Sequence, residues 1–295
     1  MGNTPEAMTL PDLTHQQVQT DEVTLHTVTA GPAAGDPVIL LHGFPEFWYG
    51  WHNQIPTLVD AGYRVIVPDQ RGYNLSDKPE RVSEYRLTTL AADVDRLLAA
   101  LGYDDVAVVG HDWGAAVLWQ LLLEYPERVE RAVPINVPHP AVFDEHFFGD
   151  VQQTIRSSYM LFFQIPILSE TLMAGKDCWG FRQFLGTTND EDTFSEADLE
   201  VYREAWRQPG APTGMLNWYR ALLRHGPGGV PTMTVEAPTM VLWGTQDPFL
   251  RRQMGEESIE FCADGRFEPI DAATHWVHHE MPGKVNVELL EFLQE

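Results

Sequence analysis

Residues 108–115 read Val-Val-Gly-His-Asp-Trp-Gly-Ala, an apolar run followed by a Gly-x-Asp-x-Gly turn. This pattern predicts a buried strand that turns sharply into a helix and raises the side chain of Asp112 at the tip of the turn. Gly110 and Gly114 stand where a Cβ would collide with the neighbouring strand or helix. The motif therefore determines one strand, one turn and one helix of the fold, together with their order.

The aspartate at the tip indicates a particular chemistry. A serine there must lose a proton before it attacks, whereas a carboxylate, with an ordinary pKa near ~3.9, is already anionic at neutral pH. Its useful target is an sp3 carbon that bears a leaving group, because the product is then an alkyl ester that water can cleave. We therefore expect an epoxide or an alkyl halide as substrate. The alternative interpretation is that Asp112 only caps the helix that follows it.

Short β-rich runs alternate with stretches of helical periodicity, which predicts an α/β fold with a mostly parallel central sheet flanked by helices. The predicted strands are 23–30, 38–41, 65–67, 106–109, 132–135, 239–243 and 267–270, and the predicted helices are 90–101, 115–125 and 285–292.

The alternation stops after residue 137, and the sequence up to 230 is rich in aromatic residues and helix formers without a strand pattern. We interpret this stretch as an inserted helical cap. The expected division is 1–137 for the first part of the core, 138–230 for the cap and 231–295 for the second part of the core. With 44% hydrophobic residues among 295, the chain is long enough to bury a full core.

Two further residues complete a nucleophile, acid and base in the chain order of such sheets. Asp247 follows the predicted strand 239–243, and His275 lies in a later loop. We expect His275 to deprotonate the water that attacks an Asp112 ester, and Asp247 to orient the imidazole and stabilise its cation. Asp271 is a rival acid, but it lies too near His275 in sequence to approach the ring easily. We interpret His278 and His279 as surface or helix-start residues.

The segment His-Gly-Phe-Pro-Glu at 42–46 follows the first buried strand and predicts the second half of an oxyanion hole. The backbone N–H groups of Phe44 and Trp113 would face the oxygen of Asp112 that becomes negative when water adds to the ester. This requires a sharp turn of the chain, which a cis Phe44–Pro45 peptide would provide. The alternative is that the segment is only a turn.

Together with Asp-Gln-Arg-Gly-Tyr at 69–73, these motifs make the chain resemble the α/β-hydrolase-fold epoxide hydrolases over nearly all of its core. The resemblance implies two cap tyrosines that bind the epoxide oxygen, and the segments 158–164 and 216–220 place them at Tyr159 and Tyr219. Phenols remain protonated at pH 7 and can donate to the alkoxide formed when the ring opens. No metal or organic cofactor is required. Aromatic residues expected to line an apolar substrate pocket, besides Phe44, are Trp48, Phe143, Phe163 and Trp276.

Rival activities use the same nucleophile. Haloalkane dehalogenases resemble this chain in the Asp-Trp pair, because an indole N–H next to the nucleophile, here that of Trp113, can hold a departing halide. They need a second halide donor, commonly an Asn after His-Gly, where this chain has Phe44. A haloacid dehalogenase that acts on fluoroacetate carries arginines after the nucleophile, where this chain has Trp113 and Ala116. A serine esterase is disfavoured because the chain contains no Gly-x-Ser-x-Gly. A non-catalytic protein that binds a small apolar ligand has no physical need for nucleophile, acid and base together.

The formal net charge of −24 excludes nucleic acid as an expected partner. It suits either a salt-adapted host or an ordinary acidic protein, and composition does not decide between them. No run of 18 apolar residues and no secretory signal pattern occurs, so we expect a cytoplasmic protein without a membrane span. Cys178 and Cys262 match no metal or redox spacing. The expected partners are a small hydrophobic epoxide and water, and a homodimer is left open.

Overall fold

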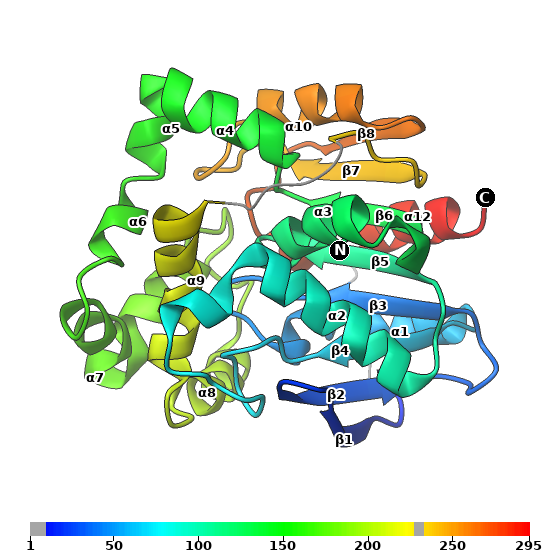
Figure 1. Cartoon of the computed structure of the whole chain (residues 1–295), viewed down its shortest axis with the longest axis horizontal. Helices are drawn as coiled ribbons and strands as arrows, with labels where there is room; N and C mark the ends of the chain where they lie inside the picture. Colours follow the sequence, from blue (N-terminus) through cyan, green and yellow to red (C-terminus); the bar gives the residue numbers. More distant parts are fainter. Residues whose placement is uncertain (1–9, 227–232) are drawn as a thin grey trace, which may run out of the picture.

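The computed structural model describes residues 10–226 and 233–295. Its centre is an eight-stranded sheet with the order β1-β2-β4-β3-β5-β6-β7-β8 (Figure 1). The first two strand pairs, β1 with β2 and β2 with β4, are antiparallel, and the others are parallel. The strands are β1 (Thr14–Gln19), β2 (Thr24–Ala30), β3 (Pro37–Leu41), β4 (Arg64–Pro68), β5 (Val106–His111), β6 (Val129–Ile135), β7 (Thr239–Gly244) and β8 (Gly265–Ile270). The predicted α/β class and mostly parallel sheet are confirmed.

Helices cover both faces of the sheet because alternate strand residues point to opposite sides. On one face, Val38 and Leu40 pack with α1 (Ile55–Asp60) and α12 (Pro282–Leu293). On the other, Ile39 and Leu41 pack with α2 (Leu87–Leu101), α3 (Trp113–Glu124) and α10 (Arg252–Ser258). The remaining short elements are η1 (Trp48–Trp51), η2 (Val82–Tyr85), η3 (Pro126–Arg128), η4 (Ile259–Phe261) and α11 (Val277–Glu280).

The seven predicted strands and three predicted helices all occur, but β1 was missed. β1 reads Thr-His-Gln-Gln-Val-Gln, and most of its residues are exposed. An edge strand that buries so little needs few apolar residues, so hydrophobic alternation does not reveal it.

Between β6 and β7, the described residues form six helices and no strand. They are α4 (Pro140–Gly149), α5 (Val151–Arg156), α6 (Tyr159–Phe162), α7 (Leu168–Leu185), α8 (Glu196–Trp206) and α9 (Ala211–His225), called the cap segment below. In Figure 1 the cap segment lies to the left, beside the carboxyl ends of the parallel strands. The predicted boundary after residue 137 falls between β6 and α4, and the boundary after 230 lies outside the described residues. The three-part division stays a prediction.

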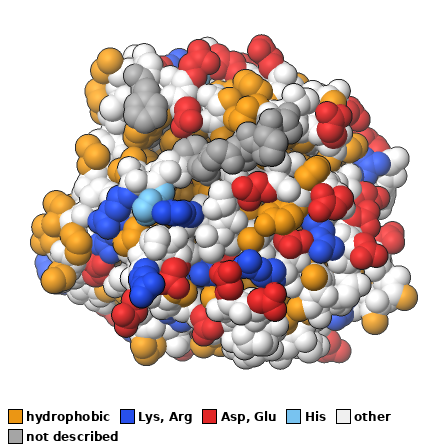
Figure 2. Space-filling view, in the orientation of Figure 1, with side chains coloured by type: hydrophobic (Ala, Val, Ile, Leu, Met, Phe, Trp, Pro, Cys, Tyr) orange, Lys and Arg blue, Asp and Glu red, His pale blue; other side chains and the backbone are white. Residues whose placement is uncertain are grey.

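The surface of the cap segment differs from that of the rest of the molecule. Figure 2 shows acidic side chains spread over this face, densely at the right, and hydrophobic side chains at the left edge, where α7 lies. Eight of the exposed large hydrophobic residues belong to the cap segment and its turns, between positions 151 and 179. No helix in the described ranges has the length and apolar character needed to cross a membrane.

Candidate active site

Asp112 stands where β5 ends and α3 begins, in the strained backbone that the elbow motif predicts. Its φ is +51°, a left-handed value that L residues seldom adopt. Close packing explains the glycines, since a Cβ on Gly110 would lie 2.5 Å from the carbonyl oxygen of Gly114. A Cβ on Gly114 would lie 2.0 Å from the carbonyl oxygen of Leu41 on the neighbouring strand. The turn thus forces the Asp112 carboxylate away from the sheet.

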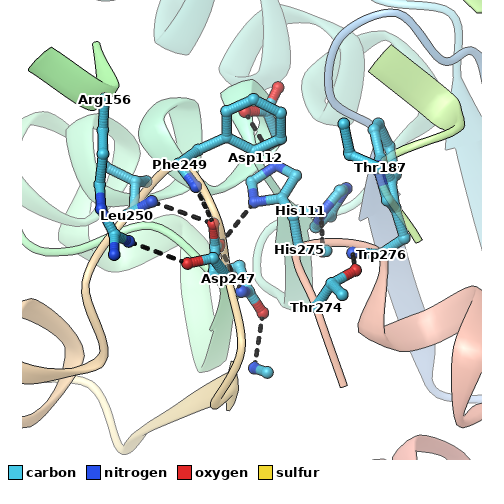
Figure 3. Close-up of polar contacts among 12 residues, drawn as sticks. His111, Asp112, Arg156, Thr187, Asp247, Phe249, Leu250, Thr274, His275 and Trp276 are labelled. Carbon is cyan, nitrogen blue, oxygen red and sulfur yellow. Dashed lines mark hydrogen bonds and ion pairs between the residues drawn. The ribbon is translucent and has the colours of Figure 1, made fainter. Parts of the chain in front are cut away.

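The loops after β7 and β8 bring two partners to this carboxylate (Figure 3). The Nδ1 atom of His275 lies 2.7 Å from Oδ2 of Asp247, and its Nε2 atom lies 3.4 Å from Oδ2 of Asp112. The imidazole therefore bridges two carboxylates that are 135 residues apart in sequence. The rival acid Asp271 is exposed.

Asp247 is buried, and each of its carboxylate oxygens accepts hydrogen bonds. The Oδ1 atom accepts from the backbone N–H groups of Phe249 and Leu250, at 2.7 and 3.0 Å. The Oδ2 atom accepts from Nδ2 of Asn136 at 2.6 Å, in addition to its contact with His275. Although burial raises the pKa of Asp247, His275 and these donors lower it below its usual value. Asp247 is thus held as an anion beside the imidazole.

The pKa of His275 is raised to about 10. Burial lowers this pKa, but the charge of Asp247 and the hydrogen bond and charge of Asp112 outweigh burial. The resting site therefore holds an imidazolium between two carboxylates. Loss of either negative charge would lower the pKa of His275, so the imidazolium would release its proton more readily.

The segment after β3 supplies a backbone donor to Asp112. The N–H of Phe44 donates to Oδ1 of Asp112 at 2.7 Å, and the Phe44–Pro45 peptide is cis, as predicted. Gly43 is required here because a Cβ would lie 2.3 Å from Cβ of Asp112. The second predicted donor, the N–H of Trp113, opens α3, and its role stays a prediction.

Tyr159 at the start of α6 and Tyr219 in α9 share one cavity with Asp112 and His275. Their rings lie 5.9 Å apart between centroids, and Tyr219 also packs edge-on against Trp113 at 5.0 Å. Burial raises the pKa of both phenols, and the charge of Asp112 raises each further. Both therefore remain protonated, and both line the cavity that holds the nucleophile.

A model of the alpha/beta hydrolase fold family matches residues 36–282. Epoxide hydrolase 2 of Caenorhabditis elegans is 34% identical, with 99% of this chain and 83% of the relative covered. The chain belongs to the α/β-hydrolase-fold epoxide hydrolases. An AB hydrolase superfamily protein of Bacillus subtilis (strain 168) is 44% identical, with 95% of this chain and 97% of the relative covered. The crystal structure of an epoxide hydrolase from Bacillus megaterium in complex with an inhibitor superimposes with a TM-score of 0.87 at 28% identity, with 95% of this chain and 100% of that chain covered.

The cavity of this epoxide hydrolase family member contains Phe44 and two of the four other aromatic residues predicted to line it. Phe143 and Trp276 line it, whereas Trp48 and Phe163 do not. Trp48 is held elsewhere, because its backbone N–H donates to Oδ1 of Asp69 at 2.9 Å and its ring packs edge-on against His15. Phe163 is 1% exposed, and its ring packs against that of Tyr219 with 4.9 Å between the ring centroids. Aromatic lining residues that the sequence did not reveal include Phe184 and Phe249.

The interpretation of His278 and His279 as surface or helix-start residues is wrong in its first part. They lie in the first residues of the short helix α11, after Val277, but both are buried around the carboxylate of Glu46. Nε2 of His279 lies 2.7 Å from Oε1 of Glu46, and Nδ1 of His111 lies 3.1 Å from Oε2. His111 also contacts the carbonyl oxygen of His275 at 2.9 Å. Because His111 directly precedes Asp112, this contact connects the loop that carries His275 to the end of β5.

In the described ranges, Glu46, His278 and His279 also form the one group with ligand atoms close enough to hold a metal ion, all within 4.8 Å. Two ligands in a tetrahedral zinc site lie about 3.3 Å apart, given bonds near ~2.0 Å. The 2.7 Å between Glu46 and His279 is instead a hydrogen-bond distance. Although burial raises the pKa of Glu46, the nearby imidazoles lower it well below its usual value. We interpret the group as a buried carboxylate paired with imidazole.

Proposed function

We propose that this protein hydrolyses a small hydrophobic epoxide to a vicinal diol through a covalent ester on Asp112. The observation that carries the proposal is the cavity in which Asp112 and His275 face the phenols of Tyr159 and Tyr219. An anionic nucleophile opposite two proton donors suits a leaving group that remains attached and needs a proton, which is the case for an epoxide oxygen.

In the first step, Oδ2 of Asp112 attacks an epoxide carbon and the carbon–oxygen bond of the ring breaks. Oδ1 is the less available oxygen, because it accepts the hydrogen bond from the N–H of Phe44. The ring oxygen takes a proton from Tyr159 or Tyr219, and the imidazolium of His275 replaces that proton. The product is a hydroxyalkyl ester of Asp112 beside a neutral imidazole.

In the second step, His275 removes a proton from water as the water oxygen attacks the carbonyl carbon of the ester. Oδ1 becomes the oxyanion, with the N–H of Phe44 2.7 Å away to stabilise it. Collapse of this intermediate breaks the bond between the carbonyl carbon and Oδ2, and the departing oxygen takes the proton of the newly added hydroxyl. The diol leaves, and the carboxylate of Asp112 and the imidazolium of His275 return. The proton that His275 gains in this step is the one that it supplies in the first step of the next turnover.

A dehalogenase is the second candidate, since it needs the same nucleophile, acid and base. It also needs donors for a departing halide, and Phe44 offers no side-chain donor at the position where such an enzyme carries one. The two phenols, in contrast, have no task in releasing a halide, because a halide leaves without a proton. The cavity therefore favours the epoxide.

Replacement of His275 by Gln tests both the ester and the leaving group. We expect His275→Gln to form the Asp112 ester but not to hydrolyse it, so the protein gains the full mass of styrene oxide in intact mass spectrometry. Asp112→Asn in the same background is the matched control and should gain no mass. With wild-type turnover established, an unmodified His275→Gln protein contradicts the mechanism. Addition of only the alkyl group from 1-bromobutane, with no reaction of the epoxide, would favour the dehalogenase.

A homodimer and a cytoplasmic location remain predictions. Mass photometry of the purified protein tests the first, and localisation of a tagged chain in its host tests the second.

A further inference from the structure

The cavity has a charged residue that the proposed reaction does not use. Asp144 in α4 lines the cavity together with Pro140 and Phe143 of the same helix. Among the described residues that line the cavity, Asp144 alone is classed as exposed. Asp144 therefore borders both the cavity and the solvent, which places this residue at an opening of the cavity.

The remaining lining offers no unpaired positive charge to compensate, because its one cation, the imidazolium of His275, is already paired with Asp112 and Asp247 at the inner end. The described lining residues include no Lys or Arg, and most are apolar or aromatic. The nucleophile Asp112 adds a second carboxylate at the inner end, and the chain as a whole carries a net charge of −24. Burial against the apolar lining raises the pKa of Asp144, so part of its surface has lost contact with water.

We infer that Asp144 selects substrates by charge at the cavity opening. It favours epoxides whose distal end is neutral or cationic and disfavours epoxides that carry a carboxylate, such as free epoxy fatty acids. A carboxylate tail that extends from Asp112 toward this opening meets a like charge in a partly desolvated position, with no Lys or Arg in the described lining to pair with it. A neutral or quaternary ammonium tail meets no such repulsion. This inference rests on the proposed function, because it concerns the substrate of the same site.

The test compares two epoxides with the same reactive end, 10,11-epoxyundecanoate and its methyl ester. The selectivity ratio is kcat/KM for the carboxylate divided by kcat/KM for the ester, with diol formation followed by mass spectrometry. Two like charges about 8 Å apart at a protein surface repel enough to change affinity by roughly 3- to 10-fold. We expect Asp144→Asn to raise the ratio by about this factor and Asp144→Lys to raise it further. Because the ratio is taken within each variant, a partial loss of folded protein cancels.

Glu145 provides the matched control. It is exposed, follows Asp144 in the same helix and does not line the cavity. We expect Glu145→Gln to leave the ratio unchanged, and sodium chloride at 0.5 M to reduce the difference between wild type and Asp144→Asn, since salt screens exposed charges. An epoxide with an ω-trimethylammonium group should show the opposite preference.

Each outcome separates the two proposals. If the wild-type enzyme opens the methyl ester but the ratio is the same in Asp144→Asn, Asp144→Lys and wild type, charge selection by Asp144 is wrong and the epoxide hydrolase activity stands. An equal change in Glu145→Gln also overturns it, because net charge then explains the effect. If the wild-type enzyme opens neither compound, nor styrene oxide, the proposed function itself fails.

Discussion

At the scale of single residues, His275 shows how the site stores and releases a proton. Its pKa of about 10 depends on the carboxylates of Asp247 and Asp112. In the proposed mechanism, only the carboxylate of Asp247 keeps its charge throughout, because formation of the ester neutralises Asp112 and so removes one of the two groups that stabilise the imidazolium. The same residue can therefore be an acid before the ester forms and a base afterwards.

Asp112→Asn imitates the loss of charge without any substrate. We expect the pKa of His275 to fall from about 10 in the wild type by one unit or more, because the amide no longer stabilises the cation. The measurement is a pH titration of the His275 ring nitrogens by NMR. Asp247→Asn should lower the pKa as well, and an unchanged pKa in Asp112→Asn would show that Asp247 alone sets it.

Single and double replacement of Tyr159 and Tyr219 tests their role as proton donors. Tyr159→Phe and Tyr219→Phe each remove one proton donor, and we expect each to lower kcat for epoxide opening by roughly 10- to 100-fold, as losing part of general acid catalysis does. The double variant should be nearly inactive, because the described cavity lining then contains no phenol. Pre-steady-state measurement of ester formation checks this, and wild-type rates in the double variant are incompatible with the assigned roles.

At the scale of helices and strands, α8 joins the cap segment to the loop that presents Phe44. The hydroxyl of Tyr202 donates to Oε1 of Glu46 at 2.9 Å, and Nε1 of Trp206 donates to the carbonyl oxygen of Pro45 at 2.6 Å. A third bond, from Tyr49 to Asp198 at 2.8 Å, is only partly buried. The cap segment therefore helps to position the backbone donor of the active site.

Tyr202→Phe tests this connection. Removal of a buried donor to a charged acceptor should lower the free energy of unfolding by roughly 1.5–3 kcal/mol, measured by urea denaturation. Tyr49→Phe is the matched control, since it removes the same group from a partly solvated bond and should cost about 1 kcal/mol or less. Equal losses in the two variants would indicate that burial of the Glu46 carboxylate contributes nothing.

At the scale of the whole molecule, a net charge of −24 opposes folding through self-repulsion. The acidic side chains are spread over the face shown in Figure 2, so salt should screen many weak repulsions together. We expect the thermal unfolding midpoint to rise by several degrees between 0.05 and 1 M potassium chloride. Sucrose at equal osmolality controls for general exclusion effects. A midpoint that does not change with salt would identify an ordinary acidic protein.

The chain by itself determined the elements whose geometry is set locally. The elbow around Asp112 was predictable because Gly110 and Gly114 are needed wherever such a turn packs this closely, and the strands because buried runs are apolar. The order of Asp112, Asp247 and His275 placed them on strand ends at one edge of a parallel sheet, and the structure brings them together.

Tertiary structure alone decided which side chains share a space. Trp48 and Phe163 are as aromatic as Phe143 and Trp276, yet only the latter two reach the cavity. Polar residues behave in the same way, since Asn136 supports Asp247 and His279 pairs with Glu46 across more than 100 positions of sequence. Residue type determines what a side chain can do. Contacts between segments that are distant in sequence determine whether the side chain reaches its partner or the cavity. Local sequence patterns carry no information about those contacts.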